Sequence, residues 1–234
     1  MPSNTAAQSA NTSSTKPPPG SAATEPALNP SPKQDQRRAC AELTTMNANP
    51  ARQRLTTQRP TDDEPVFADG AGVTVEIDIN ASPETVWTLV SDINLPGQFS
   101  DEFQGAEWVS DTPEVGAVFT GRNKNKLMGE WEVPCTLTHH QINEVFAWAS
   151  VSAENPAAHW RFDLTPQDNG TLLTFTMILG PGPSGLTMFI EKMPDKEAAI
   201  VHNRQTSQAA NMACTVEGIR DLAENKITPT EETP

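Results

Sequence analysis

The side chains best suited to catalysis in this sequence are its histidines and cysteines, but their spacing favours neither metal binding nor covalent catalysis. No histidine stands at ligand spacing from a second histidine or a cysteine, and the cysteines are scattered without a CxxC pair. The chain has no GxSxG motif, and no glycine-rich phosphate loop follows a predicted strand. We therefore expect no metal and no cofactor. The residues concerned are His139, His140, His159, His202, Cys40, Cys135 and Cys214.

The strand pattern limits these side chains further. Consecutive strand residues point to opposite faces, so at most one of His139 and His140 faces inward. By the same rule His159 faces outward if its neighbour Trp160 faces inward. Cys135 and Cys214 lie in segments of apolar pattern, which predicts buried thiols of low reactivity.

Charge and composition divide the chain into a tail and a folded part. Residues 1–60 hold seven Lys or Arg against three acidic residues, a charge of about +4, whereas the whole chain carries −14. The remainder therefore carries about −18, which would repel a phosphate backbone, so we expect no nucleic-acid partner. Residues 1–65 are rich in Ala, Ser, Thr and Pro and poor in large apolar side chains, so a disordered tail is predicted there and also over 227–234. The predicted domain covers 66–226.

Membrane insertion is not favoured by the sequence. No stretch approaches the ~18 apolar residues that a membrane-spanning helix needs, and the N-terminus lacks the apolar core of a secretory signal. We therefore expect a cytoplasmic protein with no integral membrane contact. The oligomeric state is left open.

The elements that position the candidate residues begin with a strand and two short helices. Apolar and polar residues alternate over 73–80, which predicts a strand with one wet face. Ser82 and Pro83 then provide a capping hydroxyl and a proline at the first helical position, which predicts a helix. The Pro96-Gly97 pair is expected to end that helix and to leave a turn or second short helix around 99–103.

Six further strands and a long helix follow. Short turns between consecutive strands predict an antiparallel meander. Met212, Val216, Ile219 and Ala223 recur at steps of four and three and predict one apolar face of a helix, with Pro194 interrupting the pattern before it. The strands are predicted over 106–110, 117–123, 130–141, 146–151, 158–165 and 171–179.

Short motifs accompany this order of elements. They include Ala81 to Trp87 (ASPETVW), Gly116 to Asn123 (GAVFTGRN), Trp160 to Pro166 (WRFDLTP), Asn211-Met212 and Gly218-Ile219. Together they resemble the SRPBCC superfamily (START/Bet v 1-like), in particular its bacterial polyketide cyclase/dehydrase and lipid-transport-like members. The resemblance implies an α+β helix-grip fold. In that fold a curved seven-stranded antiparallel sheet wraps around a long C-terminal helix, and two short helices follow the first strand.

The resemblance also implies an internal cavity between the sheet and the C-terminal helix. Such cavities are mostly apolar, so inward sheet positions and the facing helix supply the candidate lining. Ordinary core packing is the alternative for each of these side chains. The candidates are Phe119, Trp131, Trp160, Phe162, Phe175, Met177, Phe189, Met193 and Met212.

Three polar residues match positions near the cavity mouth of similar sequences, namely Ser100, Glu102 and Asn123. Shielding of Glu102 by Phe103 or Trp108 would raise its pKa and allow it to act as an acid or base. Alternatively, Glu102 pairs with a cation or a backbone amide and holds the loop. Asn123 is expected either to bind a ligand carbonyl or to form the turn that follows.

Arg204 of the predicted C-terminal helix is a further candidate. Its guanidinium could bind a ligand carboxylate, or it could pair with a surface acid such as Glu197 or Asp221.

The function implied is binding of an apolar or aromatic small molecule, such as a lipid, a quinone or a polyketide-like compound. The alternative is a polyketide cyclase, aromatase or dehydratase in which Glu102 moves protons, Ser100 and Asn123 bind carbonyls and Arg204 anchors the substrate. A third hypothesis, resting on the tail alone, is a partner-interaction module.

Overall fold

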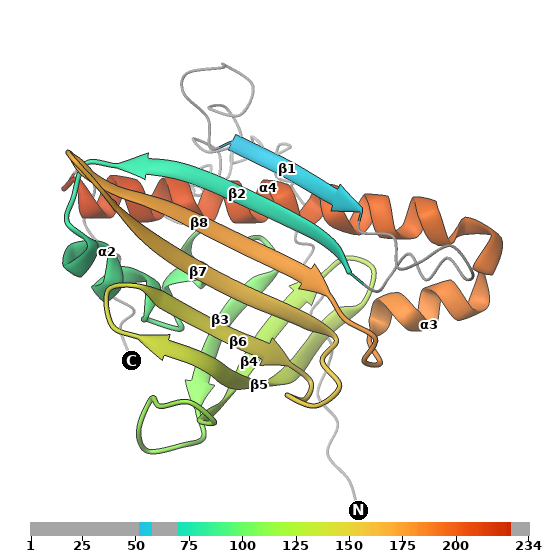
Figure 1. Cartoon of the computed structure of the whole chain (residues 1–234). Coiled ribbons are helices and arrows are strands. Elements are labelled where there is room, and N and C mark those ends of the chain that lie inside the picture. Colours follow the sequence, from blue (N-terminus) through green and yellow to red (C-terminus); the bar gives the residue numbers. More distant parts are fainter. Residues whose placement is uncertain (1–51, 58–69, 226–234) are drawn as a thin grey trace, which may run out of the picture.

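A computed structural model describes residues 52–57 and 70–225 of the chain (Figure 1). Its elements are strands and helices of an α+β fold, with the helices at the start and the end of the main domain. In chain order they are β1 (Arg52–Thr57), β2 (Ala71–Ile79), α2 (Pro83–Val90), η1 (Leu95–Gln98), β3 (Phe103–Trp108), β4 (Val118–Asn125), β5 (Gly129–Gln141), β6 (Val145–Ser150), β7 (Ala158–Gln167), β8 (Gly170–Leu179), α3 (Gly185–Lys192), η2 (Pro194–Lys196) and α4 (Glu197–Ala223).

The strands form one curved antiparallel sheet in the order β1-β2-β8-β7-β6-β5-β4-β3. All seven predicted strands are present, and the predicted helix-grip arrangement is confirmed. In Figure 1 the long helix α4 runs behind β2, with β1 beside them, while β3 to β7 curve away from it.

An eighth strand, β1, precedes the seven and lies within the segment predicted to be a disordered tail. It pairs with β2 along its whole length, and Arg54 donates to Glu76 at 3.0 Å. The sequence pattern missed this strand because an edge strand stabilised by backbone pairing and surface ion pairs needs no run of large apolar residues. The rest of the predicted tail, and the predicted C-terminal tail over 227–234, lie outside the described residues.

Alternation of side chains gives the sheet one apolar, concave face. In β2 the apolar residues of the predicted alternation are buried, and in β8 Leu173, Phe175, Met177 and Leu179 are buried in the same way. The register places Phe175 opposite Val75 and Phe162, so neighbouring strands direct their apolar residues to one side. This side faces α4 and holds the core.

The first helix begins as its sequence predicts. The Oγ of Ser82 accepts from the backbone N–H of Thr85, and Pro83 occupies the first turn of α2. The second short helix, η1, comes earlier than expected, because Pro96 lies in its first turn instead of breaking the chain there. A proline is tolerated at that position since the first N–H groups of a helix have no intrahelical acceptor.

The C-terminal part is divided at Pro194, as predicted. Ser184 and Thr187 form a reciprocal cap at the start of α3, and η2 begins at Pro194 before α4. The apolar face predicted for the long helix is buried along its length. Helix α4 packs chiefly on β2, with further contacts to β1, β8, α2 and α3.

Candidate functional site

The concave face of the sheet carries a continuous group of aromatic rings, which we call the aromatic wall: Phe119, Trp148, Trp160, Phe162 and Phe175. Phe162 and Phe175 stack with ring centroids 4.0 Å apart, and Trp148 stacks on Trp160 at 6.1 Å with nearly parallel planes. Phe119 meets Trp148 edge-on at 6.1 Å. These rings come from β4, β6, β7 and β8, and cross-strand register brings them together.

The wall is only partly covered. Phe119, Phe162 and Phe175 are buried, whereas Trp148 and Trp160 are half-buried although they point to the same side. The cause is the position of α4, which packs mainly on β2 near one edge of the sheet. The inner face of the central strands therefore retains accessible aromatic surface.

The other predicted lining residues fall into two groups. Met177 and Met212 are at most 1% exposed and belong to the core between β8 and α4. Trp131, Phe189 and Met193 are half-buried, on β5, α3 and the residue that follows α3. Trp148 was not among the predicted residues, although its alternation with Phe146 along β6 matches that of Trp160 with Phe162 and could have identified it.

A polar cluster lies at one side of this face, and we call it the Glu102 cluster. Glu102 lies just before β3, and Arg204 lies on the N-terminal half of α4. Both terminal nitrogens of the Arg204 guanidinium donate to Glu102: Nη1 to Oε2 at 2.7 Å and Nη2 to Oε1 at 2.8 Å. This is a bidentate ion pair in which the Glu102 side chain is 12% exposed and the Arg204 side chain is 29% exposed. The acid that pairs with Arg204 is thus Glu102, whereas the sequence had suggested a surface acid such as Asp221. Asp221 pairs with Arg220 instead.

Two amide side chains complete the cluster, and sequence reasoning missed both. Nδ2 of Asn125 donates to Oε2 of Glu102 at 3.1 Å, and Nε2 of Gln208 donates to Oε1 at 3.2 Å. Gln208 follows Arg204 by four residues, the spacing that places two side chains on one helix face.

Of the two alternatives for Glu102, the Glu102 cluster confirms pairing with a cation, and it corrects the other alternative, in which shielding raises the pKa. Burial by itself raises the pKa of this carboxyl, but the hydrogen bonds and charge of Arg204, with the amides of Asn125 and Gln208, outweigh burial and lower it below its ordinary value. Glu102 is therefore a stable carboxylate at neutral pH. Its lone pairs are directed at four donors, so it is poorly suited to act as a general acid.

The remaining polar candidates have structural contacts. The Oγ of Ser100, a buried residue, accepts from the backbone N–H groups of Glu102 and Phe103, which shapes the loop before β3. Asn123 is half-buried on β4, opposite Phe103 and Trp131, and its Nδ2 makes a long 3.5 Å contact to the carbonyl of Gly121. Asn123 therefore faces the same side as the wall without joining the Glu102 cluster.

The histidine and cysteine predictions that concern orientation agree with the structure. His140 packs edge-on against Trp87 and Phe146 on the inner side, whereas His139 and His159 are exposed. The Cys135 thiol is buried, and burial raises its pKa to about 12, which suppresses the reactive thiolate. Cys214, for which a buried thiol was also predicted, is instead half-buried and disulfide-bonded.

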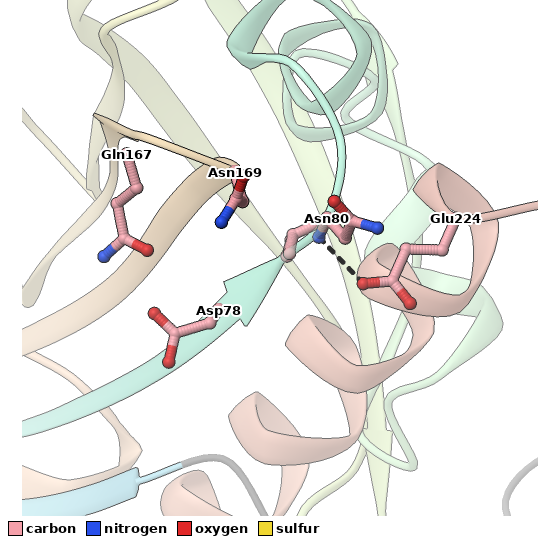
Figure 2. A pocket seen from close by; sticks show the side chains of 6 residues that line it. Asp78, Asn80, Gln167, Asn169 and Glu224 are labelled. Carbon is pink, nitrogen blue, oxygen red and sulfur yellow. Dashed lines mark hydrogen bonds between the residues drawn. The ribbon is translucent and has the colours of Figure 1, made fainter.

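Two hollows stand out in the described part of the chain, and neither is lined by the aromatic wall. The larger, of about 550 Å³, lies where the end of β2, the β7–β8 turn and the end of α4 meet. Figure 2 shows its polar lining, with the backbone N–H of Asn80 donating to Glu224 at 2.8 Å. Glu224 follows Arg204 by twenty residues, so this hollow is about 30 Å along the helix from the Glu102 cluster. The smaller, of about 80 Å³, lies at the start of β2.

Comparison with known proteins settles the family. The family model described as "Polyketide cyclase / dehydrase and lipid transport" matches residues 71–217. The chain belongs to this family. The match runs from β2 into α4 and so covers the whole concave face, and the predicted SRPBCC-type resemblance is confirmed. No curated protein matches the chain.

Solved structures of similar fold include the Polyketide_cyc-like protein Cgl2372 from Corynebacterium glutamicum. It is 27% identical with a TM-score of 0.50, over 66% of this chain and 92% of that protein. The di-domain ARO/CYC proteins StfQ, of the steffimycin pathway, and BexL, of the BE-7585A pathway, are 10% and 15% identical, each with a TM-score of 0.51. They are covered over 55% and 54% of their lengths, by 80% and 81% of this chain, and they show likeness of fold alone.

Within residues 52–57 and 70–225, no helix combines the length and the apolar character needed to cross a bilayer.

Proposed function

We propose that this family member binds an apolar or aromatic small molecule between the concave face of its sheet and α4. The observation that carries the proposal is the half-buried part of the aromatic wall, Trp148 and Trp160, on the inner face of the sheet. Large aromatic surface in such a position gains free energy when an apolar ligand covers it. Lipids, quinones and polyketide-like compounds all have suitable apolar surface.

Access to the wall is the step that the proposal requires. None of the residues of α3 is fully buried, and this helix begins beside Met128 of the β4–β5 turn. Because no residue of α3 is fully buried, we propose that displacement of α3 and of the β4–β5 turn widens the space over the wall. Phe189 and Met193 then become contacts for the ligand.

The contacts of Glu102 argue against the alternative of an enzyme in which this residue is the acid or base. The pKa of this carboxyl is lowered, and the carboxylate is held by Arg204 and two amides. A proton donor at neutral pH needs the opposite shift. We therefore assign the Glu102 cluster to ligand selection and to structure, and propose binding as the function.

The test is ligand retention by the purified full-length chain. Mass spectrometry of an organic extract of the protein is expected to detect a retained apolar species, because a site of this kind holds its ligand through purification. In parallel, the neutral dye N-phenyl-1-naphthylamine is titrated, with the tryptophan fluorescence of the protein as readout.

Two variants of neighbouring residues locate the binding. Trp160→Ala is expected to weaken dye binding by roughly tenfold, since about 1.4 kcal/mol of lost aromatic contact corresponds to that factor. His159→Ala, which changes the exposed side chain next to it on β7, is the matched control and is expected to leave binding unchanged. Absence of any retained molecule together with absence of dye binding would refute the proposal. If both variants changed dye affinity equally, the dye would bind somewhere other than the aromatic wall.

A further inference from the structure

The Glu102 cluster is a charged group beside an apolar face, and its composition restricts what that face can bind. Arg204 reaches it from α4, whereas the basic residues of β4 and β7, namely Arg122, Lys124 and Arg161, alternate to the other side of the sheet from Asn123 and Phe162. Arg161 pairs there with Asp163 at 2.7 Å. Arg204 is therefore a cation placed to meet a ligand on the inner face.

The positive charge of Arg204 is already balanced. Each oxygen of Glu102 accepts from one guanidinium nitrogen and from one amide, at distances between 2.7 and 3.2 Å. The carboxylate and the guanidinium sum to zero charge, and four hydrogen bonds oppose displacement of the carboxylate. In a half-buried pair of this kind, removing one partner leaves the other charge without a countercharge, which is costly.

We propose that the Glu102–Arg204 pair makes the site selective for neutral ligands, so that the bound molecule carries ketone, quinone or ester oxygens in place of a carboxylate. This inference rests on the proposed binding function. A ligand carboxylate at Arg204 competes with Glu102 and leaves one of two carboxylates without a countercharge beside apolar surface, which is costly. A neutral carbonyl avoids this cost and can accept from the amide of Asn123, which lies on the inner side of β4.

Glu102 is thus a specificity-determining residue. Its carboxylate occupies the guanidinium of Arg204, which would otherwise attract an anionic ligand. The complex with an anion is therefore less favourable than the complex with a neutral ligand. Besides Arg204, the side-chain amides of Asn125 and Gln208 hold the Glu102 carboxylate in place by one hydrogen bond each.

The experiment compares two probes of the same shape, methyl 2-naphthoate and 2-naphthoate, by calorimetry on the full-length chain at pH 7. The natural chain is expected to bind the ester at least roughly tenfold more tightly than the anion. Glu102→Gln preserves the shape of the side chain and leaves Arg204 unbalanced. It is expected to shift the preference toward the anion by roughly tenfold or more while ester affinity stays within about threefold.

Two further variants separate the effect of the ion pair from that of net charge. The double variant Glu102→Gln/Arg204→Gln restores neutrality and is expected to lose the gained affinity for the anion. Asp163→Asn unbalances Arg161 on the other face and changes the net charge of the chain by the same amount as Glu102→Gln, so it is expected to leave the preference unchanged. Circular dichroism of each variant establishes that it is folded before titration.

The outcomes separate this inference from the proposed function. If the natural chain binds both probes equally, or prefers the anion, selectivity for neutral ligands is refuted while binding stands. An equal shift in Asp163→Asn also refutes it, because net charge alone would then account for the change. If neither probe nor the neutral dye binds, the binding function itself fails, and the selectivity falls with it.

Discussion

At the scale of single residues, Glu102 shows how one contact decides between two chemical roles. Its neighbours in sequence, Phe103 and Trp108, suggested an apolar shield and a raised pKa. Phe103 is half-buried and Trp108 packs on Phe119, while Glu102 meets Arg204 from a segment about a hundred residues away. The contact with the guanidinium reverses the direction of the pKa shift.

The lowered pKa of Glu102 predicts how stability depends on pH. A carboxyl whose pKa is lower in the folded state stabilises the fold at pH values above its unfolded pKa, and this contribution is lost as the pH falls through the folded pKa. The stability difference between the natural chain and Glu102→Gln is therefore expected to be constant near neutral pH and to shrink as the pH falls below about 4.5, the ordinary value. Urea unfolding of both proteins over a pH series measures it. A difference that stayed constant down to strongly acidic pH would contradict the ion pair.

Asn125 is the second residue whose role depends on several contacts at once. Its Oδ1 accepts from the backbone N–H groups of Leu127 and Met128, and its Nδ2 donates to Glu102. Asn125→Ala is expected to lower the free energy of unfolding by about 1–3 kcal/mol, because two turn donors and a charged acceptor lose a partner. Asn203→Ala, which changes an exposed amide on α4, is the control and is expected to cost less than about 0.5 kcal/mol. Equal costs in chemical unfolding would show that the contacts of Asn125 are not formed.

At the scale of elements, the packing of the loop after η1 on α4 sets the position of the Glu102 cluster. Phe99 follows η1 and lies against Gly218 of α4, where an added Cβ would come within 2.4–2.5 Å of its ring. The glycine thus allows the loop that carries Ser100 and Glu102 to approach the helix. Asn211 of α4 accepts from the backbone N–H of Asp101 at 3.2 Å and fixes the same loop.

Substitution of Gly218 tests this close approach, because two effects oppose each other there. Helix propensity alone predicts that Gly218→Ala stabilises α4 by up to about 1 kcal/mol. Overpacking against Phe99 predicts a loss of about 1–3 kcal/mol, and we expect the loss to prevail. Thermal unfolding measures the sign. Adding Phe99→Leu to Gly218→Ala is expected to recover part of the loss, and a stabilised single variant would show that the helix and the loop lie further apart.

At the scale of the whole molecule, the sheet is closed unevenly. Helix α4 covers β2 and β8, with β1 added at that edge, whereas β3 to β7 curve over the space beside it. The most tightly covered part of the sheet therefore holds the core residues, and the less covered part holds the half-buried tryptophans. This division of one face into core and accessible wall is what the proposed binding depends on.

The strand β1 gives a prediction at the same scale. A chain that lacks residues 1–51 keeps β1 and serves as the reference. A chain that lacks residues 1–69 loses the pairing of β1 with β2 and its contacts with α4, and is expected to unfold several degrees lower, as ~1–2 kcal/mol of lost stability implies. Identical melting temperatures of the two truncated chains in calorimetry would show that β1 adds nothing to the fold.

Local sequence patterns were enough to predict the main elements and their inward faces. The alternation in β2, the cap at Ser82 and the stripe from Met212 to Ala223 were each buried or capped as predicted. Such patterns can be interpreted without a structure because periodicity and capping act between residues close in sequence. The strand β1 was not predicted, since an edge strand held by backbone pairing needs no pattern of apolar side chains.

The meeting of the polar residues, in contrast, depends on long-range packing. Ser100, Glu102, Asn123 and Arg204 were all candidates, but of these Glu102 and Arg204 form the ion pair, and Asn125 and Gln208 join them. The partners of Glu102 lie more than twenty and more than a hundred residues away, so their meeting depends on how the sheet curves and where α4 rests. The strength of an ion pair is set by distance in space, and that distance follows from the packing of the whole chain.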